Sequence, residues 1–252
     1  MNDAQLDQDR QYNFPYHHVG QYRNGFKASY YVRYALKHIT SLEWIISKIH
    51  SVPFQSLCDL GCGDGRLVYE LDLEFPDRQI QGIDYSERSI NLAKGIHPEG
   101  SFKQLDILED HLDEQFDLVT LVEVFEHIPL EDCRQFAEKA SALVKNKGHL
   151  LITVPHKNLP VSKKHFQHFS EESLWKYFQT WFDLVEVQYL EKKSRGRLYW
   201  YYRLLKNKLF VLNNRTVLNW IFQGYKKHLL IANSEKDCER LFFLLKKKTT
   251  EE

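Results

Sequence analysis

A glycine-rich turn between an apolar segment and a helix-like segment is the feature that most constrains this chain. Residues 56–66 read Ser-Leu-Cys-Asp-Leu-Gly-Cys-Gly-Asp-Gly-Arg, and a second apolar segment, residues 79–83, ends at Asp84. Alternate glycines let backbone approach a ligand without Cβ clashes, and a helix is expected to begin at Arg66. A carboxylate at Asp84 can accept hydrogen bonds from both ribose hydroxyls of an adenosine. Together the two segments predict a nucleoside cofactor site.

The spacing of the glycines selects among nucleoside cofactors. Gly61, Gly63 and Gly65 alternate strictly, whereas the dinucleotide fingerprint places its third glycine three residues after the second. With Asp59 before them, they resemble the first motif of the class I S-adenosylmethionine (SAM)-dependent methyltransferases, an acid and an apolar residue followed by G-x-G-x-G. The resemblance covers roughly residues 55–190 and implies that SAM is the cofactor.

The same resemblance assigns contacts to individual residues. It places Asp59 near the methionine amino group of SAM and Asp84 on the ribose. Asp106, in Gln-Leu-Asp-Ile, matches the acid beside the adenine amino group. It also implies that the glycines of the turn line the cofactor, namely Gly61, Gly63 and Gly65.

Apolar segments alternate with helical segments along most of the chain. Strands are expected at residues 56–60, 79–83, 101–105, 116–122, 149–154, 183–190 and 240–247, with helices between the first five. Such alternation is typical of an α/β, Rossmann-like, doubly wound parallel sheet. The methyltransferase resemblance implies seven strands, the last one antiparallel beside the sixth.

The chain is expected to have four parts. A helical preface, with a helix over about residues 28–50, would close over the cofactor. The SAM-binding core and a basic, aromatic helical insertion follow, and the last core strand and a tail end the chain. In this order the parts are residues 1–50, 51–191, 192–234 and 235–252.

The insertion stands out by its charge, because the whole chain has a net charge of zero. Residues 192–234 hold ten of the 34 Lys and Arg residues and none of the 34 Asp and Glu residues, with aromatic side chains interleaved. Such a surface suits phosphate, nucleotides or anionic lipid headgroups, so RNA binding and peripheral membrane contact are open alternatives. An amphipathic cap with solvated lysines explains the pattern equally well.

The remaining composition is typical of a soluble globular protein. A hydrophobic fraction of 43% is ample for a core and excludes the disordered class. Residues 1–10 are polar, and no segment approaches the roughly 18 apolar residues of a membrane span. We expect a cytoplasmic protein with four free thiols, because the cysteines have no metal-type spacing.

Two clusters of acids and histidines follow the fourth and fifth expected strands. Residues 123–127 read Glu-Val-Phe-Glu-His, and residues 165–168 read His-Phe-Gln-His. Open α/β sheets bind ligands at the carboxyl ends of their strands, so both clusters would lie at the site. Two carboxylates and two imidazoles would form an octahedral site for Mg²⁺ or Mn²⁺. Such an ion would lower the pKa of a bound hydroxyl group.

The clusters resemble the ExxEH and HxxH motifs of the small-RNA 3′-terminal 2′-O-methyltransferases. That resemblance implies four metal ligands, namely Glu123, Glu126, His127 and His168. The E-x-x-E-H stretch is similar also to ubiquinone-pathway O-methyltransferases and to bacterial enzymes that methylate sugars or natural products. It therefore indicates methylation at oxygen more closely than it indicates a substrate.

Roles without a metal remain open for the same residues. His127, with Glu126 beside it, would act as a general base, and His156 at the end of the fifth strand is a second base candidate. Glu126 could instead cap a helix. His168 could equally hydrogen-bond the substrate, while His165 would hold the loop.

We expect a SAM-dependent O-methyltransferase that acts on a small hydroxylated molecule such as a sugar, a nucleotide sugar or a biosynthetic intermediate. A hydroxyl nucleophile fits the histidine and carboxylate cluster, whereas amide nitrogens usually require an Asn-Pro-Pro-Tyr type of motif where this chain has Glu-His-Ile-Pro. RNA 3′-terminal 2′-O-methylation and a non-catalytic SAM-binding module are the alternatives.

Overall fold

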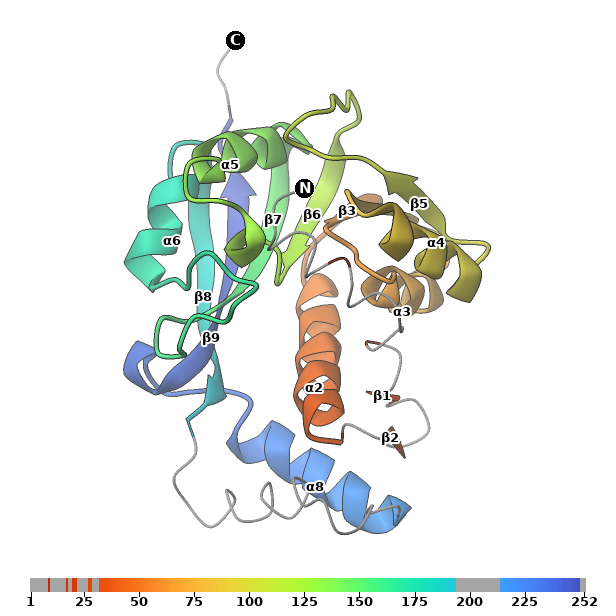
Figure 1. Ribbon diagram of the computed structural model, residues 1–252, viewed down its shortest axis with the longest axis vertical. Coiled ribbons are helices and arrows are strands. Elements are labelled where there is room, and N and C mark those ends of the chain that lie inside the picture. The colour runs from red at the N-terminus through yellow and green to blue at the C-terminus, as the bar shows by residue number, and fades with distance from the viewer. Residues whose placement is uncertain are drawn as a thin grey trace.

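A seven-stranded sheet forms the centre of the protein (Figure 1). The computed structural model describes residues 32–193 and 214–249, together with Asp9, His17, Gly20–Gln21 and Lys27–Ala28. The sheet order is β5-β4-β3-β6-β7-β9-β8, and β9 runs antiparallel to both of its neighbours while the other pairs are parallel. The strands are β3 Ser56–Leu60, β4 Gln79–Asp84, β5 Ser101–Gln104, β6 Phe116–Val122, β7 Val144–Pro155, β8 Phe182–Lys192 and β9 Cys238–Lys247.

Helices cover both faces of this sheet (Figure 1). One short 3₁₀ segment follows β6 and another precedes β9. A hairpin of two two-residue strands precedes the first helix. The helices are α2 Val32–Ile49, α3 Arg66–Glu74, α4 Glu87–Ile96, α5 Cys133–Ala142, α6 Glu171–Phe178 and α8 Arg215–His228; the 3₁₀ segments are η2 Phe125–His127 and η3 Glu235–Asp237; the hairpin strands are β1 Gly20–Gln21 and β2 Lys27–Ala28.

The expected seven-stranded α/β fold is confirmed, including the antiparallel last strand beside the sixth. Two bounds differ from expectation by more than two residues. β7 begins at Val144 instead of residue 149, because Val144 pairs with Phe116 across an irregularity in the register. The first helix begins at Val32 instead of residue 28, because Lys27–Ala28 pairs with β1. In the basic insertion, α8 follows its N-cap Asn214, and residues 194–213 of the insertion lie outside the described residues.

Side chains of the central strands alternate between two cores, as the period of two in a strand requires. Leu118 and Leu151 belong to the core under α2, α3, α4 and α8. Their neighbours Val119 and Ile152 belong to the core under α5 and α6. Central strands buried on both faces read as continuous apolar runs, which explains why the sequence pattern was clear.

Helix α8 packs across one end of α2 (Figure 1). Its Leu218, Phe222 and Tyr225 side chains are buried in the core under α2, α3, α4 and α8. An ion pair of 2.6 Å joins Lys226 of α8 to Glu43 of α2. The described part of the insertion is therefore a helical cap on the core.

Two further expectations concern single properties of the chain. All four cysteines are free thiols and are buried. None of the helices within the described ranges has the length and apolar character that crossing a bilayer requires.

The aromatic side chain of η2 supplies a test of how the site is supported. Phe125 is fully buried. The centroid of its ring lies 5.2–5.9 Å from the ring centroids of four other aromatic residues, Phe136, Phe169, Tyr177 and Phe178. We expect Phe125→Ala to lower the free energy of unfolding by about 3–5 kcal/mol, because it leaves a cavity among these rings. Urea denaturation measures this. Leu130→Ala, at a side chain that is 57% exposed, should change it by less than about 0.5 kcal/mol, and equal effects would contradict the packing argument.

Candidate active site

The glycine turn after β3 is pressed between two neighbouring elements. The backbone N–H groups of Gly61 and Cys62 both donate to the carbonyl of Ile83, at 2.7 and 3.0 Å. Gly61 has a φ of 82°, and a Cβ at this position would lie 2.4 Å from Cγ2 of Val124. Only glycine therefore lets the turn lie this close to the segment after β6.

The carboxylate at the end of β4 is held rigidly by backbone donors. The Gly63 N–H donates to one oxygen of Asp84 and the Ser86 N–H to the other, both at 2.9 Å. Burial raises the pKa of Asp84, and these two hydrogen bonds oppose the shift. The backbone thus fixes the orientation of the Asp84 carboxylate, which is predicted to bind the ribose.

Two cavities meet at the turn. The smaller, of about 90 Å³, has mainly apolar walls and contains Asp84 and Asp106. The larger, of about 320 Å³, contains Asp59 and many charged side chains. Both cavities are lined by Gly61, Glu123, His127 and Lys164. A ligand that extends past Gly61 would therefore occupy both.

Asp59 is the acid of the larger cavity closest to the turn in sequence. Its side chain is buried and accepts a hydrogen bond of 2.7 Å from the Thr120 hydroxyl. Burial raises the pKa of Asp59 to about 7, although the Thr120 hydrogen bond lowers it. A cationic ligand group beside Asp59 would compensate this buried carboxylate.

These residues fit SAM. Asp84 and Asp106 would hold the adenosine in the smaller, apolar cavity, and Asp59 would hold the methionine amino group in the larger one. Gly65 lies outside the linings of both cavities: it begins α3 with a φ of 76°, and a Cβ there would lie 2.8 Å from the Cβ of Ala93. The structure thus gives Gly65 a packing role against Ala93. The predicted contact of Gly65 with the cofactor stays a prediction.

The raised pKa of Asp59 predicts a pH dependence of cofactor binding. With a pKa of about 7, Asp59 is mostly protonated at pH 6 and mostly ionised at pH 7.5, and only the ionised form attracts an ammonium group. We expect the Kd of SAM to rise about eightfold from pH 7.5 to pH 6. Isothermal titration calorimetry measures this, and Asp59→Asn should remove most of the dependence. An unchanged pH profile in Asp59→Asn would assign it to another group.

A carboxylate and two imidazoles gather where the two cavities join. One ligand atom from each of Glu126, His127 and His165 lies within 4.8 Å of the others. The Glu126 side chain is 1% exposed, and its Oε2 has no hydrogen-bond partner among the described residues. Burial, and then the charge of Glu123, raises the pKa of Glu126 well above its ordinary value. An unpartnered buried carboxylate of this kind favours a cation or a proton beside it.

Hydrogen bonds determine which nitrogen of each imidazole carries a proton. Nδ1 of His127 lies 3.0 Å from the Lys164 carbonyl, and Nδ1 of His168 lies 3.0 Å from the Leu159 carbonyl. A carbonyl only accepts, so both Nδ1 atoms donate. Nε2 of His168 then accepts from Nδ1 of His165, at 2.7 Å. His127 and His165 are therefore left with their lone pairs on Nε2.

Both rings are neutral at physiological pH. Burial is the largest cause that lowers the pKa of His127 to about 4 and that of His165 to about 3. The group thus presents two nitrogen lone pairs and one carboxylate, which can bind a cation or accept a proton.

The other two predicted metal ligands lie one contact further out. Glu123 accepts from the Thr153 hydroxyl at 3.1 Å and from the Arg240 guanidinium at 2.7 Å, so both carboxylate oxygens are engaged. His168 lies behind His165 and orients it. The structure brings Glu126 and His127 together with His165, and the metal assignment itself stays a prediction.

A charged network that the sequence analysis missed borders the larger cavity. Arg240 contacts Glu123 and also Glu191, at 2.7 and 2.5 Å, and Lys37 contacts Glu191 at 2.8 Å. Glu123 and Glu191 have φ values of 59° and 57°, which are rare for residues with a side chain. Glu191 lies near the carboxyl end of β8, which runs parallel to β7. This position at a strand end is a signal from which the sequence could have indicated Glu191. Arg240 lies near the start of an antiparallel strand and carries no such signal.

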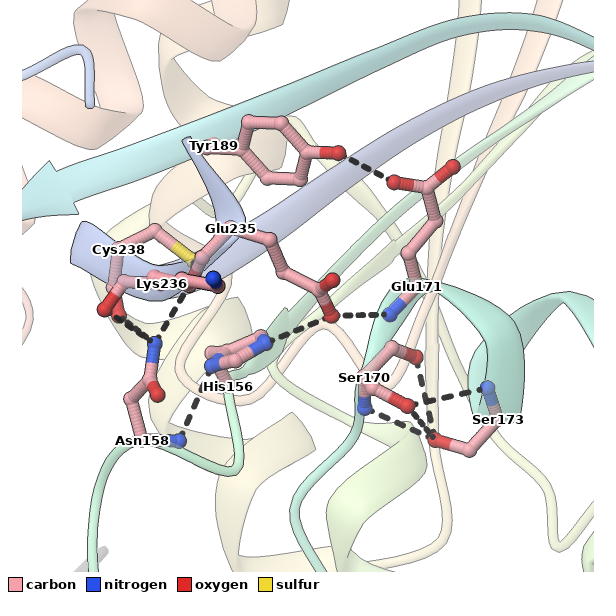
Figure 2. A network of polar contacts seen from close by, with 9 residues as sticks. All are labelled: His156, Asn158, Ser170, Glu171, Ser173, Tyr189, Glu235, Lys236 and Cys238. Carbon is pink, nitrogen blue, oxygen red and sulfur yellow. Dashed lines mark hydrogen bonds and ion pairs between the residues drawn. The ribbon is translucent and has the colours of Figure 1, made fainter. Parts of the chain in front are cut away.

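His156, the second base candidate, belongs to a separate network (Figure 2). It is 1% exposed and lines neither of the two cavities. Its Nδ1 accepts from the Asn158 N–H, and its Nε2 lies 3.0 Å from Glu235, which also accepts from the Glu171 N–H. The ring therefore joins the end of β7 to η3 and to the start of α6, a structural arrangement.

This arrangement predicts a loss of stability without a loss of turnover. We expect His156→Ala to lower the free energy of unfolding by about 1–3 kcal/mol, because Glu235 and the Asn158 N–H each lose a partner. The kcat measured at a temperature where the variant is folded should stay within about twofold of the wild type, since one lost catalytic proton transfer costs about a hundredfold or more. A loss of kcat of that size in a folded variant would support the prediction that His156 is a base.

Comparison with known proteins agrees with this site. The chain matches the methyltransferase domain family over residues 54–203 and therefore belongs to that family. Together, the family, the fold and the cavities define a class I SAM-dependent methyltransferase. The chain is similar to the ubiquinone biosynthesis O-methyltransferase of Bordetella avium, with 29% identity over 123 residues that cover 46% of this chain and 49% of the relative. It thus spans about half the length of the curated relatives it matches.

Solved structures share the fold at low sequence identity. The N-methyltransferase NodS from Bradyrhizobium japonicum, in complex with S-adenosyl-L-homocysteine, has a TM-score of 0.57 and 14% identity, with 84% of this chain and 88% of that chain covered. A SAM-dependent methyltransferase from Archaeoglobus fulgidus has a TM-score of 0.57 and 18% identity, with 87% and 95% covered. Similarity at this level shows the fold alone.

Proposed function

We propose that this chain transfers the methyl group of SAM to a hydroxyl group of a small polar molecule. The observation that carries the proposal is the group of Glu126, His127 and His165 at the junction of the two cavities. Methyl transfer from a sulfonium to a hydroxyl needs an aligned oxygen and a place for its proton. The names of the matched relatives, ubiquinone biosynthesis O-methyltransferases, support oxygen as the accepting atom.

The lining of the larger cavity supports a polar acceptor. Charged and hydroxyl side chains from α2, β7, β8 and β9 surround it, among them Lys37, Ser41, Thr153, Glu191 and Arg240. Burying a long apolar tail against these groups would remove the water that solvates them. A compact acceptor with several hydroxyl groups, such as a sugar or a nucleotide sugar, would replace that water with its own hydrogen bonds.

The chain's own side chains would carry out the proton transfer. The acceptor oxygen forms a bond to the methyl carbon as the carbon–sulfur bond breaks, and the electron pair of that bond neutralises the sulfonium. The hydroxyl proton passes to Nε2 of His127, which is neutral and carries its lone pair there. Glu126, about 4.0 Å from that nitrogen, would stabilise the resulting imidazolium.

The same three groups also fit a divalent cation. Two imidazole nitrogens and one carboxylate, with the buried Oε2 of Glu126 unpartnered within the described ranges, are a donor set that suits Mn²⁺ better than Mg²⁺. When bound, such an ion would lower the pKa of the acceptor hydroxyl. Glu126, His127 and His165 would hold it, with His168 fixing the orientation of His165.

Turnover with and without metal separates the two forms of the proposal. We expect Glu126→Gln and His127→Asn to keep SAM binding within about twofold and to lower kcat at least about a hundredfold, because they remove proton handling and not cofactor contacts. The assay is SAM turnover with hydroxylated small molecules, after EDTA and after Mg²⁺ or Mn²⁺ readdition. Rescue by Mn²⁺ would support the cation, whereas EDTA-resistant turnover would assign His127 as the base.

A matched control variant is available on the surface. His111→Asn changes an imidazole that is 86% exposed and paired only with Asp113 among the interactions described, so kcat should not change. If Glu126→Gln and His127→Asn keep full turnover, the group is not catalytic. Loss of SAM binding in both would instead mean that they disturb the turn.

RNA 3′-terminal 2′-O-methylation is a second candidate, favoured by the ExxEH and HxxH pattern and by the basic residues of α8. Arg215, Lys226 and Lys227 lie on this helix, and Lys226 pairs with Glu43. RNA binding through such residues should weaken steeply with salt. Short RNAs in the same turnover panel test this candidate, and a protein that binds SAM but methylates nothing in the panel would favour a binding module.

A further inference from the structure

One histidine far from the glycine turn in sequence lies against it in the structure. Nδ1 of His17 lies 2.8 Å from Oδ1 of Asp64, within the turn, and the His17 carbonyl accepts a hydrogen bond of 2.9 Å from Arg66. The Asp64 side chain has no exposed surface and that of His17 is 20% exposed. The contact therefore attaches His17 to a buried part of the cofactor turn.

His17 lines the larger cavity together with Asp59, Gly61 and Gly63. Its ring lies 5.0 Å from the ring of His38 on α2, measured between centroids. The cavity lining and the Asp64 contact thus place the imidazole at the end of the cavity where the amino acid part of SAM would lie.

The amino acid part of SAM carries an ammonium group and a carboxylate. Asp59 is the complement of the ammonium group, so the carboxylate needs a cationic or hydrogen-bonding partner nearby. Two of the other cations of the cavity have acidic partners: Lys37 pairs with Glu191 and Glu239, and Arg240 pairs with Glu123 and Glu191.

Arg66 is engaged as well, because its guanidinium donates twice to Glu70, at 3.1 and 2.8 Å, and once to the His17 carbonyl. The acidic partner of His17 is Asp64, which in contrast belongs to the glycine turn itself. In its cationic form a histidine donates from both nitrogens, so Nδ1 can bind Asp64 while Nε2 donates to a ligand.

We infer that His17 is a cofactor-binding residue that hydrogen-bonds the carboxylate of the methionine part of SAM, with Asp64 fixing the orientation of its ring. The inference rests on SAM as the cofactor and is independent of the methyl acceptor. It adds a residue from outside the glycine turn and the strand ends to the set that would hold SAM.

Two adenosine ligands separate this role from a general effect on the fold. S-adenosylhomocysteine carries the amino acid part, whereas 5′-methylthioadenosine has the same adenosine and sulfur without it. We expect His17→Ala to raise the Kd of S-adenosylhomocysteine about tenfold, the loss of one hydrogen bond to a charged group. The Kd of 5′-methylthioadenosine should stay within about twofold. Isothermal titration calorimetry without any methyl acceptor measures both.

A second residue of the N-terminal part serves as the control. Asp9 contacts Ser86 and lies 3.5 Å from Arg88, and it lines neither cavity. Asp9→Asn should therefore leave the ratio of the two Kd values unchanged. His17→Gln, which keeps a side chain that can donate, should recover part of the lost affinity and covers the case in which His17→Ala does not fold.

Three outcomes would overturn the inference. Equal weakening of both ligands in His17→Ala would mean that the residue acts through the turn. Unchanged binding of S-adenosylhomocysteine would remove it from the site, and a wild-type chain that binds neither ligand would remove SAM itself. Failure of the proposed methyl transfer to hydroxyl groups would leave these binding constants unaffected, so the two proposals fail separately.

Discussion

The close approach of Gly61 to Val124 is the contact on which the candidate site depends. A Cβ at Gly61 would lie 2.4 Å from Cγ2 of Val124, so any other residue would push the turn after β3 away from the segment after β6. That segment carries Glu123, Glu126 and His127, and the turn would carry the cofactor. The absence of one side chain therefore sets the distance between the place where SAM would bind and the groups that would receive a proton.

Burial of charge dominates the chemistry of this region. Asp59, Asp84 and Glu126 are nearly inaccessible to water, and burial is the largest cause of the raised pKa of each. Asp84 is compensated by backbone N–H groups, whereas Glu126 has an oxygen without a partner inside the described ranges. The difference fits two roles, a fixed ligand for the ribose and a group that takes a cation or a proton.

Much of the fold was predictable, because the central strands are buried on both faces and read as apolar runs between helices. Asp84 and the Glu123–His127 segment were found for a related reason: the carboxyl ends of parallel strands meet at one edge of the sheet. The same reasoning would have found Glu191 near the end of β8. That reasoning could not tell which of His165 and His168 lies in the cavity group with Glu126 and His127. Two histidines on one loop are distinguished only by the carbonyls and rings that they contact in the folded protein.

The sequence by itself determined the glycine turn, the acid at the end of β4 and the alternation that produces a doubly wound sheet, because these depend on local periodicity and backbone freedom. Only the tertiary structure decided which charged groups share a cavity. Arg240 meets Glu123 across 117 positions of the chain, and His17 meets Asp64 across 47. No local pattern encodes such contacts, because they arise from the antiparallel insertion of β9 and from the position of His17 against the turn. Those long-range contacts assign Glu123 to an ion pair and leave Glu126, His127 and His165 facing the cavity.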